Sequence, residues 1–228
     1  MNGKIGMRVI SVFLAVMLVS VVVPTVSAQV AAEVSGDTSL ETINDLRGKD
    51  ISMGEFYEKI TPVEFSALPA EIQNECYNTK MVWLELPKIG DKVQVIQHNA
   101  STLETKFTDV RMRSIVILMR HVSDIGADGR SIDYRSESWV VFPPYLPLPY
   151  GEVSSGLYKL DPDGQTGTLV DYVFESGEKI DNLKAEGSKT VTESGYYFTE
   201  GLHLFYAPAG YTLSPSLSRT QTDAIYVS

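Results

Sequence analysis

The chain has few of the residues that carry covalent or metal chemistry. Its 228 residues include one cysteine, Cys76, and three histidines. A single cysteine excludes an intramolecular disulfide, so an apolar core must stabilise the fold, and a chain of this length can supply one. We expect the Cys76 thiol to be a buried structural group, because cysteine is among the most buried residue types. An intermolecular disulfide and a reactive thiol are the alternatives.

The chain also lacks the common sequence motifs of catalysis. It has no HExxH, CxxC or GxSxG pattern, and no glycine-rich phosphate loop follows a predicted strand. His98, His121 and His203 are 23 and 82 residues apart, so only the fold could bring them together as a zinc site. We expect isolated surface or strand histidines, no metal ion and no cofactor. The paired carboxylates of a glycoside hydrolase remain compatible with the many dispersed acidic residues.

Basic residues are outnumbered by acidic ones. The chain has 19 lysines and arginines against 29 aspartates and glutamates, which gives a net charge of −10. Clustered basic side chains bind nucleic acids and anionic membrane surfaces, so this balance argues against both as partners. Two basic residues and no acidic residue lie before position 29, so the rest of the chain has 17 basic and 29 acidic residues, a net charge of −12.

The chain has one long apolar run, from Val9 to Val23. Lys4 and Arg8 precede it, Pro24 follows it, and small residues lead to Ala28, which is the organisation of a secretory signal peptide. We predict that residues 1–28 are a signal peptide cleaved after Ala28 and that the protein is secreted or held at the cell surface. The alternative is an uncleaved membrane anchor, but the run has 15 residues and a spanning helix needs roughly 20.

The next two segments differ in pattern. Residues 29–37 are small, polar and unpatterned, which predicts a flexible tether. Residues 38–78 are predicted to form a short helical segment, because three hydroxyl residues are each followed three positions later by Glu, as at many helix starts. These capping boxes are Thr38 with Glu41, Ser52 with Glu55, and Thr61 with Glu64, the last around Pro62.

From residue 79 onward the periodicity changes to two, with Gly, Asn, Asp and Pro between the apolar segments. This pattern predicts a β-sandwich-like domain over residues 79–228. The expected fold class is therefore α+β, a short N-terminal helical segment followed by a mainly antiparallel β-sandwich. The expected strands are Met81–Leu86, Lys92–Gln97, Ser114–Arg120, Ser138–Phe142, Thr168–Glu175, Tyr196–Phe198, His203–Ala207 and Ala224–Val227.

Local patterns add detail to this sandwich. Ile115–Met119 is apolar throughout, which predicts a central strand, whereas Val93 has polar neighbours, as in a strand nearer an edge. Hairpin turns are predicted at Ser176-Gly177 and Glu200-Gly201, because Gly suits the backbone of tight turns.

Four prolines in FPPYLPLPY, residues 142–150, exclude a central strand there. We expect an extended polyproline II crossover between two sheets, with its Tyr and Leu side chains packed on the core. The alternative is a ligand for an aromatic groove in a partner, because Pro144 and Pro147 have PxxP spacing.

The run Asp161–Gly164 (DPDG) has two interpretations. Calcium prefers several carboxylate oxygens on one tight turn. An EF-hand loop that starts at Asp161 would need Gly at position 166 and Glu at position 172, where this chain has Thr166 and Tyr172. A type I turn with Pro162 at its second position explains the run without a metal, and we favour that interpretation.

Two sequence features concern the protein surface: one could be a modification site and the other a binding face. Asn99 begins an N-x-S sequon in a predicted loop, which makes it a candidate glycosylation site. Tyrosines are frequent after residue 140, and we expect them to fill strands in the core, with a stacking platform for sugars or a protein-binding face as the alternative. They are Tyr145, Tyr150, Tyr158, Tyr172, Tyr196, Tyr197, Tyr206, Tyr211 and Tyr226.

No motif assigns a function. The leading hypothesis is an exported, non-enzymatic protein that binds a surface polymer or a protein partner through strand edges and loops. The alternative is an exported hydrolase that acts on a glycan or peptide, and a third hypothesis retains the N-terminal segment as an anchor for a surface assembly. A cleft with facing carboxylates or converging histidines would favour the hydrolase. An aromatic strip on one sheet face would favour binding.

Overall fold

The computed structural model describes residues 43–228 except 44, 97–100, 110–115, 145 and 212–213. No helix within this part of the chain combines the length and apolarity needed to cross a membrane. Several sequence predictions lie outside the described residues and stay predictions. They are the signal peptide with its cleavage after Ala28, the tether at 29–37, the Thr38 capping box, and the positions of His98, Asn99 and Tyr145.

The helices described over their whole length precede the strands and are short: α2 (Met53–Ile60), α3 (Pro62–Ser66) and α4 (Ala70–Asn78). The capping box at the start of α2 is confirmed, because the Glu55 amide donates to Ser52 Oγ and the Ser52 amide donates to the Glu55 carboxylate. The Thr61 box is wrong. Thr61 also ends α2, so its hydroxyl turns back to donate to the carbonyl of Tyr57 at 3.4 Å instead of capping α3.

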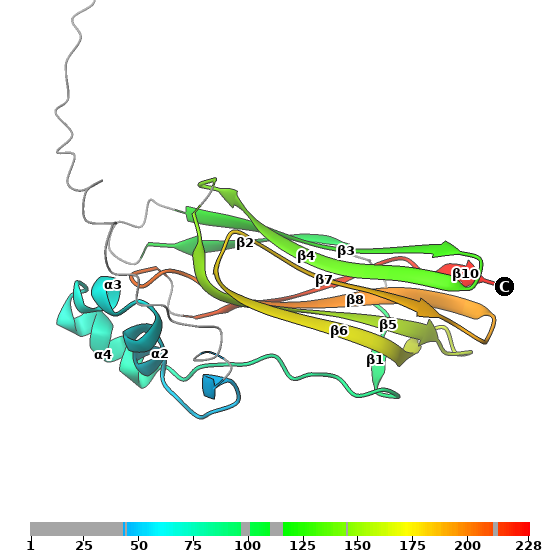
Figure 1. The fold of residues 1–228 in the computed structure, drawn as a ribbon, viewed down its shortest axis with the longest axis horizontal. Coiled ribbons are helices and arrows are strands. Elements are labelled where there is room, and N and C mark those ends of the chain that lie inside the picture. Colours follow the sequence, from blue (N-terminus) through cyan, green and yellow to red (C-terminus); the bar gives the residue numbers. More distant parts are fainter. Residues whose placement is uncertain (1–42, 44, 97–100, 110–115, 145, 212–213) are drawn as a thin grey trace, which may run out of the picture. The chain divides into compact units, whose positions relative to one another are not determined.

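The strands form two antiparallel sheets that lie one over the other (Figure 1). One has the order β1-β6-β5-β8-β10, with β9 also paired to β8, and the other has the order β2-β3-β4-β7. This arrangement confirms a mainly antiparallel, sandwich-like β fold with a few short helices. The strands are β1 (Lys92–Gln94), β2 (Thr102–Thr108), β3 (Val116–Asp128), β4 (Ser131–Phe142), β5 (Leu148–Leu160), β6 (Thr166–Ile180), β7 (Asn182–Thr190), β8 (Gly195–Tyr206), β9 (Ser216–Gln221) and β10 (Ile225–Val227).

The predicted strand boundaries are only partly right. The edge position of Val93 is confirmed, and β3 lies inside its sheet as expected. Met81–Leu86 is not a strand, while Tyr196–Phe198 and His203–Ala207 belong to one strand, β8, which ends at Tyr206. The predicted turn glycines Gly177 and Gly201 lie within β6 and β8. Strands β2, β5, β7 and β9 were not predicted.

The proline-rich segment runs from one sheet to the other. Strand β4 of the four-stranded sheet ends at Phe142, and β5 of the six-stranded sheet starts at Leu148. The expectation that the whole segment stays outside a central strand is wrong, because β5 lies between β6 and β8. Pro149 is tolerated there because it forms no register pair, and pairing with β8 starts only at Tyr150.

Apolar side chains pack between the sheets and on the outer face of the six-stranded sheet. Between the sheets, clusters around Val153 and Leu157 draw residues from both sheets. A third cluster joins the helices to the outer face of the six-stranded sheet, where Phe56 meets Tyr150 and Tyr206. Cys76 is fully buried in this cluster, which confirms the expectation of a structural cysteine, and burial raises the pKa of its thiol.

A buried ion pair fixes the helical segment to the sheet. Glu152 on β5 is inaccessible to solvent and accepts hydrogen bonds from Arg47 Nε at 2.9 Å and from the Leu84 amide at 2.7 Å. Tyr150 also donates to this carboxylate, at 2.8 Å. Further along, Gly90 donates to the carbonyl of Leu169 on β6. The helices and the following extended segment therefore cover part of the outer face of the six-stranded sheet.

Candidate functional site

The outer face of the four-stranded sheet is exposed and carries a row of polar side chains along β4. Burial alternates along this strand: Tyr134, Ser136 and Ser138 face the other sheet, and the residues between them face solvent. This alternation follows from the period of two in a β-strand. The outward row is Asp133, Arg135, Glu137 and the half-buried Trp139.

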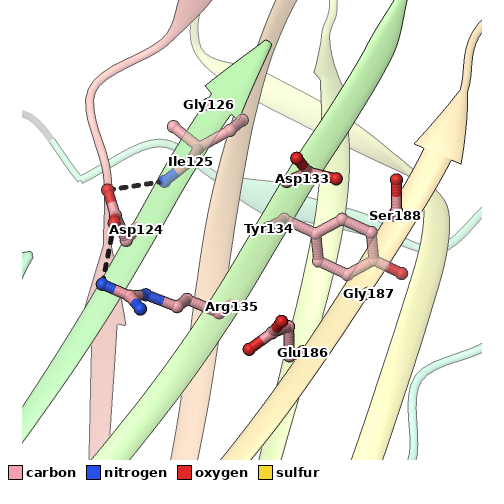
Figure 2. A pocket seen from close by; sticks show the side chains of 9 residues that line it. All are labelled: Asp124, Ile125, Gly126, Asp133, Tyr134, Arg135, Glu186, Gly187 and Ser188. Carbon is pink, nitrogen blue, oxygen red and sulfur yellow. Dashed lines mark hydrogen bonds and ion pairs between the residues drawn. The ribbon is translucent and has the colours of Figure 1, made fainter. Parts of the chain in front are cut away.

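Arg135 is the centre of a charge network that crosses three strands. It pairs in register with Asp124 on β3 and Glu186 on β7, and its Nη2 lies 3.2 Å from Asp124 Oδ2 (Figure 2). Lys184 forms an ion pair with Glu186, and this contact, together with the charge of Arg135, lowers the pKa of the Glu186 carboxyl. Opposite charges alternate across the face, so each charge of the network lies beside one of opposite sign.

Beside this network lies a shallow hollow of about 600 Å³ (Figure 2). Gly126 opens it, because no atom lies within 4 Å of the position that a Cβ would occupy there. Gly126 pairs with Asp133, and Asp133 pairs with Ser188 on β7, so a carboxylate and a hydroxyl flank the open position. The hollow offers both hydrogen-bond donors and acceptors to a ligand.

A second hollow of about 620 Å³ surrounds Trp139 farther along β4. Its walls include Glu137, Pro144 and Asn182, and the Asn182 side-chain amide donates to the Glu137 carboxylate at 2.9 Å. Trp139 pairs in register with Arg120, whose guanidinium bonds to Glu104. An indole with polar neighbours therefore lies at one end of the row, and the first hollow lies at the other.

The two hollows suit an elongated ligand that follows β4. Trp139 lies six positions after Asp133, and a strand rises about 3.3 Å per residue, so the row is about 20 Å long. The row holds two acids, one base and one large aromatic ring, and its register partners add the Asn182 amide, the Ser188 hydroxyl and the aliphatic Val122. Such a surface supplies hydrogen bonds along its length and a flat apolar contact at one end.

The histidine expectation is wrong, because His121 and His203 are not isolated. Their ring centroids are 5.0 Å apart between the two sheets, and both side chains are fully buried. Burial lowers the pKa of His121 to about 4, and burial with the charge of His121 lowers the pKa of His203 well below its usual value. In the part of the chain that the structure describes, no three His, Cys, Asp or Glu side chains are grouped to hold a metal.

The turn interpretation of Asp161–Gly164 is confirmed. The Gly164 amide donates to the carbonyl of Asp161 at 2.9 Å, which closes the turn. The Asp161 carboxylate accepts hydrogen bonds from Lys92, Thr166 and Thr168, and these donors lower its pKa to about 2. Its oxygens are therefore engaged by the protein's own donors.

Half of the described tyrosines after residue 140 fill the core, as expected from strand propensity. Four are buried: Tyr150, Tyr158, Tyr197 and Tyr206. Two are exposed, Tyr196 on β8 and Tyr226 on β10, where the strands pair and the rings meet edge to face at 5.1 Å. This exposed pair lies on the six-stranded sheet, so Trp139 is the aromatic side chain of the β4 row.

Comparison with known proteins identified no relative of this chain. No protein-family model matches the chain, and no curated protein and no solved structure shows significant similarity to it. The candidate site therefore rests on its geometry. Sequence reasoning did not propose the β4 row, although the alternation of Asp133, Arg135, Glu137 and Trp139 with buried residues has the period of a strand with one solvated face.

Proposed function

We propose that the protein is an exported, non-enzymatic binding protein that holds a neutral glycan polymer along the exposed face of its four-stranded sheet. The organisation that goes with this proposal is a cleaved signal peptide, a short tether, a helical segment over residues 38–78 and a β-sandwich from residue 79. The observation that carries it is the difference between the two outer faces. The helices pack on part of one face, whereas the other leaves a row of polar groups and an indole open to solvent.

The chemistry of the row favours a glycan. The indole of Trp139 offers a flat apolar surface to the apolar face of a sugar ring. The carboxylates, guanidinium and amide beside it match the donors and acceptors of sugar hydroxyls. A net charge of −10 repels polyanions, which favours a neutral polymer.

Binding is favoured over hydrolysis by the state of the groups that hydrolysis would need. Asp124 and Glu186 on the open face are ion-paired with Arg135 and Lys184. The two converging histidines are fully buried, where no substrate reaches them.

Co-sedimentation with insoluble cellulose and chitin tests the proposal. Retention of the protein on at least one of these polymers is expected, with a loss of at least tenfold in affinity for Trp139→Ala. Tyr226→Ala is the matched control, because it removes an exposed aromatic ring from the other sheet. Failure to bind either polymer, or equal losses for the two variants, would contradict the proposed site.

A further inference from the structure

A layer of polar side chains crosses the core between two apolar clusters. It is built from inward-facing residues of both sheets, which most sandwich cores fill with aliphatic side chains. Each member except Thr105, which is half-buried, is less than one-tenth exposed. The layer contains Thr105, His121, Ser123, Ser136, Ser138, Ser155, His203 and Thr220.

These side chains form one unbranched chain of hydrogen bonds. Ser138 Oγ lies 2.8 Å from Nδ1 of both His121 and His203, so a single hydroxyl bridges the two rings. The outer nitrogens are engaged as well: His121 Nε2 meets Thr105 at 2.8 Å, and His203 Nε2 meets Thr220 at 2.8 Å. From Thr220 the chain continues through Ser123 and Ser136 to Ser155, with oxygen separations of 2.5, 2.8 and 3.0 Å.

The bond at the Ser155 end fixes which group donates and which accepts in every other hydrogen bond of the series. Ser136 donates its hydroxyl proton to Ser155, so its bond to Ser123 must be one that it accepts. Each hydroxyl has one proton, and Ser123 therefore donates to Ser136 and accepts from Thr220. Thr220 has then used its own proton, so it accepts from His203 Nε2.

The direction fixes opposite tautomers for the two rings. His203 carries its proton on Nε2, so its Nδ1 accepts from Ser138. Ser138 in turn accepts from Nδ1 of His121, whose Nε2 accepts from Thr105. Both imidazoles are neutral in this pattern, and all four ring nitrogens have a partner.

An added proton on His203 has no acceptor among these side chains, whereas one on Nε2 of His121 would turn Thr105 from a donor into an acceptor. If Nδ1 of His203 becomes a donor, Ser138 faces two N–H groups and its own hydroxyl proton loses its acceptor. The groups facing the rings are the hydroxyls already named and the ring of Phe205. Among the described residues, no acid or base bonds to either ring, and the charged neighbours on the same strands alternate to the outer faces. These neighbours are Glu104 and Lys106 on β2, Arg120 on β3, Glu137 on β4, Glu152 on β5, Glu200 on β8 and Arg219 on β9.

We propose that the hydrogen-bonded chain is an acid-sensitive lock between the two sheets. It holds β3 and β4 against β8 and β9 while both imidazoles are neutral, and protonation of either ring opens it. Buried charge without a partner is strongly unfavourable, and the second ring lies only 5.0 Å away. The lock does not depend on what the open face binds.

The backbone of β8 is adapted to the lock at Gly201. A Cβ there would lie 2.5 Å from the hydroxyl oxygens of both Ser123 and Ser136. Any larger residue would push these two serines apart and interrupt the chain. The sequence prediction of a turn at this glycine is wrong for that reason, since the missing side chain makes room for the polar layer.

The first test is ¹⁵N NMR of the imidazoles in the full chain at pH 7, with His98→Gln to leave two signals. The expected result is a proton on Nδ1 of His121 and on Nε2 of His203. The same tautomer in both rings, or a charged ring, overturns the proposal. This measurement needs no change in the lock itself.

The second test follows the same protein on acidification by near-UV circular dichroism and by hydrogen exchange in β4 and β8. Both rings should stay neutral until they titrate together with loss of the packed state, at a pH below 6.5. Titration of either ring near pH 6.5 with the packed state retained overturns the lock.

A third test asks whether His203 itself sets the pH of the acid transition. His203→Gln should move the acid transition to lower pH, whereas Arg120→Gln on the outer face should leave it in place. An unchanged midpoint in a folded His203→Gln protein also overturns the lock. If His203→Gln does not fold, the two measurements above decide the question.

Discussion

The outer faces of the two sheets differ in how far they are buried. The six-stranded sheet buries part of its outer face under the helices, and even the carboxylate of Glu152 is fully enclosed there. The four-stranded sheet leaves Asp133 and Arg135 in solvent. Both strands at issue, β5 and β4, are interior strands of their sheets. The contrast shows that a strand's place in its sheet does not decide its burial; what packs on the sheet does.

The same contrast separates the two kinds of ion pair. Arg47 and Glu152 form a pair that has lost most of its water, with side-chain exposures of 23% and 0%. Arg120 and Glu104 form a pair that is 42% exposed on both sides. A buried charge depends on its partner, whereas an exposed one is supported by water. Stability should therefore depend on the first pair and hardly on the second.

The largest expected effect comes from breaking the covered face. Arg47→Met removes the cation that neutralises Glu152 and should lower the free energy of unfolding by about 3–5 kcal/mol. Urea denaturation at pH 7 measures this change. Arg120→Met is the matched control and should cost no more than about 1 kcal/mol. Equal losses in the two variants would show that burial does not distinguish the two faces.

Acid should lower the free energy of unfolding through the histidines buried between the two sheets. His121 has a folded-state pKa of about 4 and an unfolded value near 6.5, so the unfolded chain binds more protons between these values. Its contribution is fully present above pH 6.5 and is lost on going down to pH 4, a loss of about 3 kcal/mol. His203 acts in the same direction, while Glu200, whose pKa is raised by burial, opposes it. Denaturation at pH 7, 5.5 and 4.5 measures the slope, and a flat profile would refute this account.

A smaller effect is expected at the cap of the helix that begins the cover. Ser52→Ala removes the hydroxyl that accepts from the Glu55 amide and should cost about 1 kcal/mol. The Ser52→Asp variant keeps an acceptor at the cap and should restore stability. Thermal unfolding of the three proteins checks the order. A loss in Ser52→Ala that Asp does not repair would assign the effect to something other than capping.

The smallest effect is expected on the open face. Arg135→Ala should change the free energy of unfolding by no more than about 0.5 kcal/mol, because its guanidinium is hydrated and the lost ion pair is exposed. Urea denaturation in low and moderate salt measures it. A loss of several kcal/mol would mean that this face is structural, and the binding proposal would lose its main support.

The local parts of the fold were the most predictable from sequence. The Ser52 capping box and the Asp161–Gly164 turn depend on residues within three or four positions of each other, and both predictions are confirmed. The predicted burial of Cys76 follows from residue type and is also correct. Strand β5 was missed because its sequence, LPYGEVSSGLYKL, does not alternate. Both of its faces are buried, and its polar residues bond across the fold rather than to water.

The candidate site and the lock were harder to predict for a related reason. Register places Arg135 between Asp124 and Glu186, which are 11 and 51 positions away along the chain. The bridge from His121 through Ser138 to His203 joins residues up to 82 positions apart. The sequence shows which side chains are available, but strand pairing and sheet packing select the ones that meet.

The sequence by itself determined the acidic balance, the absence of an internal disulfide, the β-rich composition and the local caps and turns. These properties follow from composition or from contacts between near neighbours. Only the tertiary structure decided which sheet face is covered, why Gly201 lies within a strand, and that two distant histidines share one serine. Such contacts depend on the packing of one sheet against the other, and that packing exists only once the whole chain has folded.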